Sequence, residues 1–440
     1  MTVVPRTRLT LIELIQCVCT GYLMLRPVSQ NEILIPVLGL LGLTSLIGLL
    51  QRGRMSSSVL AVIALMLAIG LYGSAVGVNN PGFTAGLLVW LAAPLLYGAW
   101  VLSGSERLIR GIFWTAAIAT IALSGFILLY VAGNTGRFPQ IIPAALVQET
   151  GAGFNIEGNT TAIRLYGLSS LVALAPMWIV AALSRKSLLL PPRPVIIVAA
   201  ILAGSAALVG GRNAIVLVSL AIPAMWLVWR AFRSLPWKIP VGGFILGVFA
   251  LISAPFAIGA LASTPVVQRT WAAAMALFTG GNDTITQQSE RLEQAAQLIQ
   301  WWKQAFVTGH GFGTIIPGYA RSAERPWTFE LQYHLLLAQF GLVGAIITAV
   351  LVLVSARAII LAYRARPDLS TPLTVALAAG VSMLIAHGAN PYLQAPGHMW
   401  APWLVFVIVN VALLHPTRSA TPTNNGEKLV SVHRLEDKCN

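Results

Sequence analysis

The stretch SSSVLAVIALMLAIGLYGSAV, residues 56–76, carries no charged side chain over its whole length. An α-helix rises 1.5 Å per residue, so about twenty apolar residues cross the ~30 Å hydrocarbon core of a bilayer. Comparable runs recur near residues 9–25, 33–50, 56–76, 82–103, 112–132, 162–183, 195–209, 214–229, 240–262, 331–355, 371–388 and 399–414. Backbone groups in lipid must be paired within each segment, and the one-in, one-out alternation of membrane strands is absent. We therefore predict an all-α polytopic membrane protein with about twelve transmembrane helices.

The composition supports the same fold class, because 57% of the 440 residues are hydrophobic and only 10% are charged. A soluble globular protein does not have this balance. No stretch outside the apolar runs is long or varied enough to close a separate core, so we expect one transmembrane bundle over residues 1–415. The bundle includes two extracytoplasmic loops, 133–161 and 263–330, and a disordered cytoplasmic tail follows over residues 416–440.

The basic residues indicate the orientation. With the N-terminus in the cytoplasm, most of the 28 Lys and Arg residues fall in segments on the cytoplasmic side, as the positive-inside rule requires. Contact with the cytoplasmic leaflet accounts for most of the net charge of +14, so nucleic-acid binding is not indicated. The first apolar run is followed by Arg26-Pro27 and not by a small-residue cleavage site, so we expect the first helix to be retained.

The cysteines do not favour redox or zinc chemistry. Cys17 and Cys19 lie in the first predicted helix, and Cys439 lies in the tail. No pair is placed for an extracytoplasmic disulfide or a metal cage.

The longer outer loop contains QQSERLEQAAQLIQWWKQAFV, residues 287–307. Helical spacing places six of its apolar residues on one face: Leu292, Ala295, Ala296, Ile299, Trp302 and Phe306. This pattern predicts an amphipathic helix, which either lies at the membrane interface or packs on the bundle. Gly309-His310-Gly311-Phe312-Gly313 follows, and its backbone amides could face an anion.

Glu330 and His334 stand four residues apart where the next long apolar run begins. On the first turn of a helix they would share one face, and the carboxylate could fix the tautomer of the histidine. An ionisable residue at the end of a membrane span is a candidate functional residue. The alternative is a histidine that is simply hydrated at the interface.

Three arginines suggest an anion site on the outer face. Arg212 lies in a hairpin between two predicted spans, Arg291 in the amphipathic segment and Arg164 at the outer end of another span. A guanidinium presents a planar fork of donors that fits a diphosphate. Arg212 could instead extend to the lipid head groups.

Five segments within residues 160–415 resemble, in order, the O-antigen ligase and polymerase superfamily of bacterial surface-polysaccharide assembly. They are Gly211-Arg212-Asn213-Ala214, Glu290-Arg291 with Trp301, Thr308-Gly309-His310-Gly311-Phe312-Gly313, His334-Leu335-Leu336-Leu337 with Phe340-Gly341-Leu342-Val343-Gly344, and Asn390-Pro391-Tyr392-Leu393.

The resemblance implies glycosyl transfer at the periplasmic face of the bacterial inner (plasma) membrane. The donor would be a polyprenyl-diphosphate-linked glycan, and the acceptor a lipid-linked glycan or the lipid A core, with no metal or cofactor. Catalysis would rest on His334 and Glu330, and diphosphate binding on Arg212, Arg291 and Arg164. Membrane lipids and a chain-length regulator are further candidate partners.

Two departures from the family pattern bear on which reaction is expected. Leu335 stands where the family's ligases have Asn after the histidine, and Gly211 stands where the family has Ser. We therefore favour a polymerase of O-antigen or exopolysaccharide repeats over an O-antigen ligase. A transporter or flippase is the second alternative, for which interrupted spans and charges near the bilayer centre would be typical.

Overall fold

The computed structural model describes residues 9–27, 31–52, 55–134, 139–142, 153–157, 160–164, 168–209, 213–234 and 285–416. Its α-helices are α1 (Leu11–Leu25), α2 (Asn31–Arg52), α3 (Ser57–Gly77), α4 (Phe83–Leu87), α5 (Ala93–Leu102), α6 (Glu106–Asn134), α8 (Leu171–Leu183), α9 (Arg193–Val209), α10 (Asn213–Ser234), α13 (Ile285–Gln304), α14 (Gln332–Ala365), α15 (Ser370–His387) and α16 (Trp400–Leu414). A π-helical segment, η1 (Leu88–Ala92), joins α4 to α5. Short 3-10 turns are η2 (Leu168–Ser170), η4 (Pro367–Leu369), η5 (Tyr392–Gln394) and η6 (Pro396–His398).

The described part of the chain contains 6 helices that are long and apolar enough to cross a membrane, and five shorter apolar helices of 10–17 residues. The prediction of a helical protein with membrane-spanning segments is thereby confirmed. These helices coincide with all the predicted spans except the one near 240–262, which lies outside the described residues. The count of twelve crossings stays a prediction.

The segment predicted to begin a span at residue 162 is different. Residues Gly153–Glu157 (β1) and Thr160–Arg164 (β2) form a two-stranded antiparallel hairpin, and the helix begins only at Leu171. Three Thr and Ile residues in β2 favour an extended backbone, because β-branched side chains fit a strand better than a helix. Arg164 therefore lies on a strand and not at the end of a helix.

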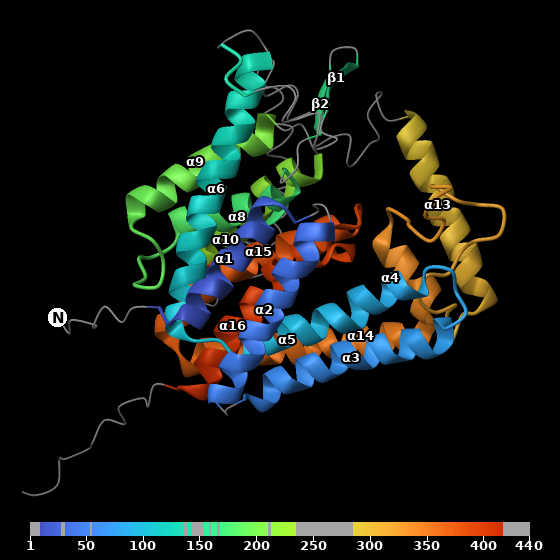
Figure 1. Cartoon of the computed structure of the whole chain (residues 1–440), viewed down its shortest axis with the longest axis horizontal. Helices are drawn as coiled ribbons and strands as arrows, with labels where there is room; N and C mark the ends of the chain where they lie inside the picture. The colour runs from blue at the N-terminus through green and yellow to red at the C-terminus, as the bar shows by residue number, and fades with distance from the viewer. Residues whose placement is uncertain are drawn as a thin grey trace, which may run out of the picture.

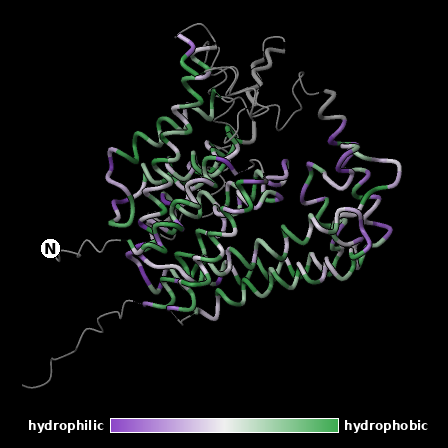
Figure 2. Tube along the Cα trace, viewed as in Figure 1, coloured by the Kyte–Doolittle hydropathy of each residue, from purple (hydrophilic) through white to green (hydrophobic). Residues whose placement is uncertain are grey.

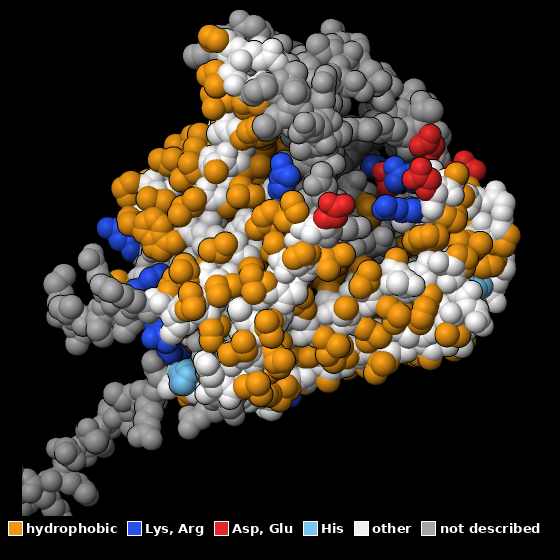
Figure 3. Space-filling model, in the orientation of Figure 1, with side chains coloured by type: hydrophobic (Ala, Val, Ile, Leu, Met, Phe, Trp, Pro, Cys, Tyr) orange, Lys and Arg blue, Asp and Glu red, His pale blue; other side chains and the backbone are white. Residues whose placement is uncertain are grey.

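The helices pack around a central group in which α15 contacts α8 and α16, while α3 and α14 lie side by side at the lower edge of Figure 1. Both are apolar along most of their length (Figure 2). Only 11% of the most apolar window of α14 is buried, compared with 61% for the window that contains α15. Apolar side chains accordingly cover much of the surface in Figure 3, as expected for a surface that faces lipid.

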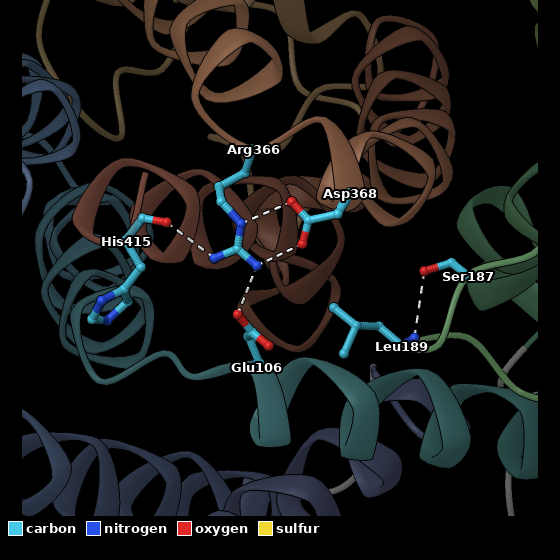
Figure 4. A network of polar contacts seen from close by, with 6 residues as sticks. All are labelled: Glu106, Ser187, Leu189, Arg366, Asp368 and His415. Atoms are coloured by element: carbon cyan, nitrogen blue, oxygen red, sulfur yellow. Dashed lines mark hydrogen bonds and ion pairs between the residues drawn. The ribbon is translucent and has the colours of Figure 1, made fainter. Parts of the chain in front are cut away.

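Arg366 ties the far end of α14 to two other helices (Figure 4). Its guanidinium donates to both carboxylate oxygens of Asp368, at 2.8 and 2.6 Å, and to Oε1 of Glu106 at the start of α6, at 2.8 Å. It also donates to the backbone oxygen of His415, which follows α16, at 3.1 Å. The bidentate pair with Asp368, the stronger class of ion pair, orients the guanidinium, and its single hydrogen bonds to Glu106 and His415 link the end of α14 to the ends of α6 and α16.

Helix α14 is interrupted at Gly341, whose φ of 58° is left-handed. The loop after α13 fills the interruption: the amides of His310 and Gly311 donate to the carbonyls of Ala338 and Gln339, at 2.9 and 2.8 Å. On the other side of the interruption, the amides of Leu342 and Val343 donate to the carbonyls of Phe306 and Val307. A backbone interruption in an apolar helix is tolerated when its freed groups are paired in this way.

The glycines of this loop serve that packing. Gly309, Gly311 and Gly313 all have positive φ, and a Cβ on Gly309 would lie 2.4 Å from the carbonyl oxygen of Gln339. The amide of Phe312 donates to the carbonyl of Gly73 in α3. The expectation that the loop amides face an anion is therefore wrong for residues 309–312, since each of these amides donates to a backbone carbonyl.

Candidate functional site

Glu330 lies on the segment that connects α13 to α14, and its carboxylate joins two arginines. Its Oε2 lies 2.9 Å from Nε of Arg291, and its Oε1 lies 2.5 Å from a terminal nitrogen of Arg321. The two arginine side chains are 41% and 48% exposed, so both guanidiniums remain within reach of a ligand, whereas Glu330 is 17% exposed. Arg291, Arg321 and Glu330 together carry a charge of +1. Burial raises the pKa of the neighbouring Tyr319, and the carboxylates of Glu293 and Glu290 lie close enough to raise it further.

Helix α13 positions the cluster through Gln294, which is buried. Its side-chain oxygen accepts hydrogen bonds from the backbone amides of Glu330 and Leu331, at 3.0 and 2.9 Å. Gln294 is three residues from Arg291, so both project from one face of α13. Leu298, one turn further on, packs with Phe329 and Leu335 in a small apolar cluster. These contacts hold the start of α14 against α13.

The predicted helix in the long loop is confirmed as α13, and it packs on the bundle through residues that lie outside most of its apolar stripe. Gln294 and Leu298 are buried, and Trp301 donates from Nε1 to the hydroxyl of Thr314 at 3.0 Å. Leu292 and Phe306, two members of the apolar stripe, are 67% and 46% exposed. The helix packs on the bundle through a face that carries the buried amide of Gln294, and of the apolar stripe Trp302 packs against the cluster around Leu298.

His334 lies in the first turn of α14 and is half-buried. Glu330 does not share that turn, because α14 begins at Gln332 and its N-cap residue is Leu331. The expected hydrogen bond between Glu330 and His334 is not formed. In the part of the chain that the structure describes, His334 makes no hydrogen bond, and the carboxylate of Glu330 pairs with Arg291 and Arg321 instead.

The segment that contains Asn390-Pro391-Tyr392-Leu393 lies beside the start of α14. Gln394 donates from its side chain to Oε1 of Gln332 at 2.7 Å, and the hydroxyl of Tyr333 donates to the carbonyl of Leu384 at 2.5 Å. Two segments that are more than fifty residues apart in sequence thus meet at the end of α14 that carries His334.

His398 is a second histidine near this end of the bundle that the sequence did not single out. It is 1% exposed, and its Nε2 lies 2.9 Å from the hydroxyl of Ser169. Burial lowers the pKa of His398 to about 3, so its imidazole is neutral near pH 7. It therefore adds no positive charge to the site.

The structure pairs two of the predicted site residues, Arg291 and Glu330, and adds Arg321. Arg291 and Arg321 both contact Glu330, and His334 lies four residues beyond Glu330, in the first turn of α14. Arg321 was missed because no local pattern links it to a carboxylate nine residues away. Arg212 lies outside the described residues, and only the backbone of Arg164 is described, so their place in this site stays a prediction.

The sequence matches no protein-family model and shows no significant match to a curated protein.

Proposed function

We propose that this chain transfers a glycosyl group from a polyprenyl-diphosphate-linked saccharide to a sugar hydroxyl, and that it polymerises O-antigen or exopolysaccharide repeats. The proposal places about twelve spans in a bacterial inner membrane, with the site facing the periplasm. The observation that carries it is the cluster of Arg291, Arg321 and Glu330, in which Glu330 precedes His334 of α14 by four residues.

The cluster suits a diphosphate leaving group. As the bond between the anomeric carbon and the phosphate oxygen breaks, the electron pair leaves with the diphosphate, and the guanidiniums stabilise the added negative charge. Partly exposed ion pairs are worth only ~0.2–1 kcal/mol each, so a diphosphate can replace Glu330 as the partner of Arg291 and Arg321. Glu330 then positions the two guanidiniums before the donor binds, which differs from the predicted role of orienting His334.

His334 is the candidate general base. The acceptor hydroxyl is a weak nucleophile, and a neutral imidazole removes its proton while the oxygen bonds to the anomeric carbon. Attack from the face opposite the diphosphate inverts the anomeric configuration. An imidazole without a hydrogen-bond partner in the described residues is available for this proton transfer.

Ligation of the glycan to the lipid A core remains the alternative within the same reaction class. It uses the same donor and differs only in the acceptor, and Leu335 after the histidine disfavours it.

Transport is the second candidate function, because one observation favours it: α14 is interrupted at Gly341. In transporters, the ends of such half-helices bind the substrate. Here the carbonyls of Ala338 and Gln339 and the amides of Leu342 and Val343 pair with the loop over residues 306–311. The interruption is filled by the chain itself, so we favour the enzyme.

The decisive experiment supplies purified protein with a polyprenyl-diphosphate-linked repeat. We expect the lipid-linked chain to lengthen without a nucleotide sugar. A requirement for added lipid A core would favour the ligase. Movement of the donor across a vesicle membrane without any change of glycan length, unaffected by His334→Ala, would exclude the enzyme.

A further inference from the structure

Helices α1 and α6 pack side by side and begin at the same level (Figure 1). The hydroxyl of Ser105, just before α6, donates to Oε1 of Glu13 in α1 at 2.6 Å. Nε of Arg107 lies 3.4 Å from Oε2 of the same carboxylate. These contacts fix the first turns of the two helices at one end of the bundle, which the basic residues predict to be cytoplasmic.

A surface groove runs between the two helices. On α6 it is lined by Arg107, Arg110, Trp114 and Ile118, and on α1 by Leu14 and Val18. The spacing of three or four residues places each set along one side of its helix. At the floor, α6 approaches α1 closely at Gly111, where a Cβ would lie 2.6 Å from the sulfur of Cys17.

The walls of the groove are apolar and open to the surroundings. Val18 and Ile118 are each 64% exposed, and Trp114 is 37% exposed. From Arg107 to Ile118 the helix rises ~17 Å, which is close to half of the ~30 Å hydrocarbon core. The groove therefore has the depth of one leaflet, with cations at one end and apolar side chains along the rest.

Among the described residues, Arg110 has no polar partner. Its Nε is enclosed without a hydrogen bond, and the described residues offer the rest of its guanidinium neither a hydrogen bond nor an ion pair. Arg107 shares its partner Glu13 with the backbone amide of Thr10 and the hydroxyl of Ser105. An enclosed guanidinium nitrogen without a partner is costly, so the arrangement favours an anionic ligand at the level of the head groups.

We propose that this groove binds one anionic phospholipid. Its phosphate lies against Arg107 and Arg110, and an acyl chain follows Trp114, Ile118 and Val18 toward the middle of the bilayer. A free phosphate ion would leave the apolar walls unexplained. Basic pockets between transmembrane helices on the cytoplasmic side are known to suit anionic head groups. This site is separate from the proposed glycosyl-transfer site, and the proposal does not depend on that reaction.

The test uses the full chain in detergent micelles that contain phosphatidylglycerol or, at the same amount, phosphatidylcholine with identical acyl chains. We expect phosphatidylglycerol to raise the unfolding temperature more than phosphatidylcholine does. Arg110→Gln should lose most of this difference, because one basic contact near an anionic head group changes the binding constant about fivefold. Native mass spectrometry of the same samples should show one retained phosphatidylglycerol on the wild type, and the same lipid on a several-fold smaller fraction of this variant.

The double variant Arg185→Gln/Lys186→Gln is the matched control. Both side chains are exposed and lie away from the groove, on the side that is also predicted to be cytoplasmic. The double change removes two positive charges, whereas Arg110→Gln removes one. It should keep the wild-type response. Val18→Trp keeps both arginines and fills the groove, so it should lose the response even if Arg110→Gln does not fold.

Three results would overturn the proposal. The first is a wild-type response from Val18→Trp or from folded Arg110→Gln. The second is an equal loss in the control, which would indicate a diffuse surface charge. The third is an equal rise in unfolding temperature with inorganic phosphate alone, which would indicate a site for the free anion.

Discussion

The side-chain oxygen of Gln294 lies 3.0 Å from the backbone nitrogen of Glu330, so a buried amide on the loop helix fixes the residue that joins the two arginines. The same oxygen accepts from Leu331, the N-cap of α14. Through this residue the loop helix and the helix that carries His334 are held in one arrangement.

Replacing Gln294 by Leu should destabilise this arrangement. The change leaves two amides without an acceptor, and each unpaired buried group costs ~1–3 kcal/mol. We expect a lower unfolding temperature and weaker donor binding, measured by thermal unfolding and by titration with a polyprenyl-diphosphate. Gln297→Leu is the control, because Gln297 is half-buried on the same helix and makes no hydrogen bond within the described residues. Equal effects of both changes would contradict the role of Gln294.

Removal of either arginine of the cluster should nearly abolish transfer. Arg291→Ala and Arg321→Ala each delete a cation that stabilises the leaving diphosphate, and loss of one such group typically costs ~10²–10³ in rate. Lys should restore little activity, since it lacks the bidentate fork. Arg325→Ala is the control, because its side chain is exposed on the same segment and has no ion pair among the described residues. Transfer by Arg291→Ala and Arg321→Ala at the rate of Arg325→Ala would end the diphosphate-binding proposal.

Arg212→Ala should also lose nearly all transfer, and Arg164→Ala should have an intermediate effect. The measurement is the rate of glycan transfer by protein whose membrane insertion has been checked. Full activity of both variants would mean that Arg212 and Arg164 do not bind the diphosphate, and that Arg291 and Arg321 bind it alone.

His334 and Glu330 should differ in what their loss changes. His334→Ala removes the general base and should lower the maximal rate by ~10²–10⁴. Glu330→Gln keeps a hydrogen-bond acceptor but loses the charge that holds Arg291 and Arg321, so we expect mainly a raised KM for the donor. Kinetics at varied donor concentration separate the two effects. If Glu330→Gln lowered only the maximal rate, in parallel with His334→Ala, the carboxylate would act with the histidine after all.

Gly341→Ala should destabilise the protein. The backbone at this position, with φ 58° and ψ −157°, costs a residue with a side chain ~1–3 kcal/mol, and the new Cβ would lie 2.5 Å from the backbone nitrogen of Gly309. Gly125→Ala in α6 and Gly204→Ala in α9 are matched controls, because a Cβ at either position meets nothing within 4 Å. Thermal unfolding should show a loss for Gly341→Ala alone, and an unchanged unfolding temperature would mean that the interruption of α14 is not needed.

The orientation is testable with single cysteines in a chain whose own three cysteines are replaced. Cysteines at Gly153 and Ser322 should react from outside the cell with an impermeant thiol reagent. A cysteine at Ser184, on the expected cytoplasmic side, should not react. Because the Ser184 side chain is buried, a cysteine there would not react on either side, so the exposed Lys186 is the better position. Lys186→Cys should be labelled only after the membrane is permeabilised. The opposite pattern would reverse the predicted topology and move the proposed active site to the cytoplasm.

The apolar runs determined most of the helical structure. A stretch such as 56–76 can satisfy its backbone only as a helix in lipid, and the structure has α3 at Ser57–Gly77. The run near 162–183 did not show where its helix begins. Residues 160–164 are rich in β-branched side chains and form a strand, which pairing with residues 153–157 stabilises.

The sequence also singled out Arg291, Glu330 and His334 as candidate site residues. It did not predict the contacts that they make. The period of residues 287–307 showed that a helix forms, yet an apolar stripe in a membrane protein can face lipid as readily as protein. Only packing against the start of α14 decided that Gln294 and Leu298 turn inward. Likewise, Arg321 pairs with Glu330 only in the folded loop. The amides of His310 and Gly311 find acceptors only because the interruption at Gly341 frees two carbonyls of α14. Helix formation follows from local spacing and solvent, whereas ion pairs and buried faces depend on contacts between segments that the sequence separates.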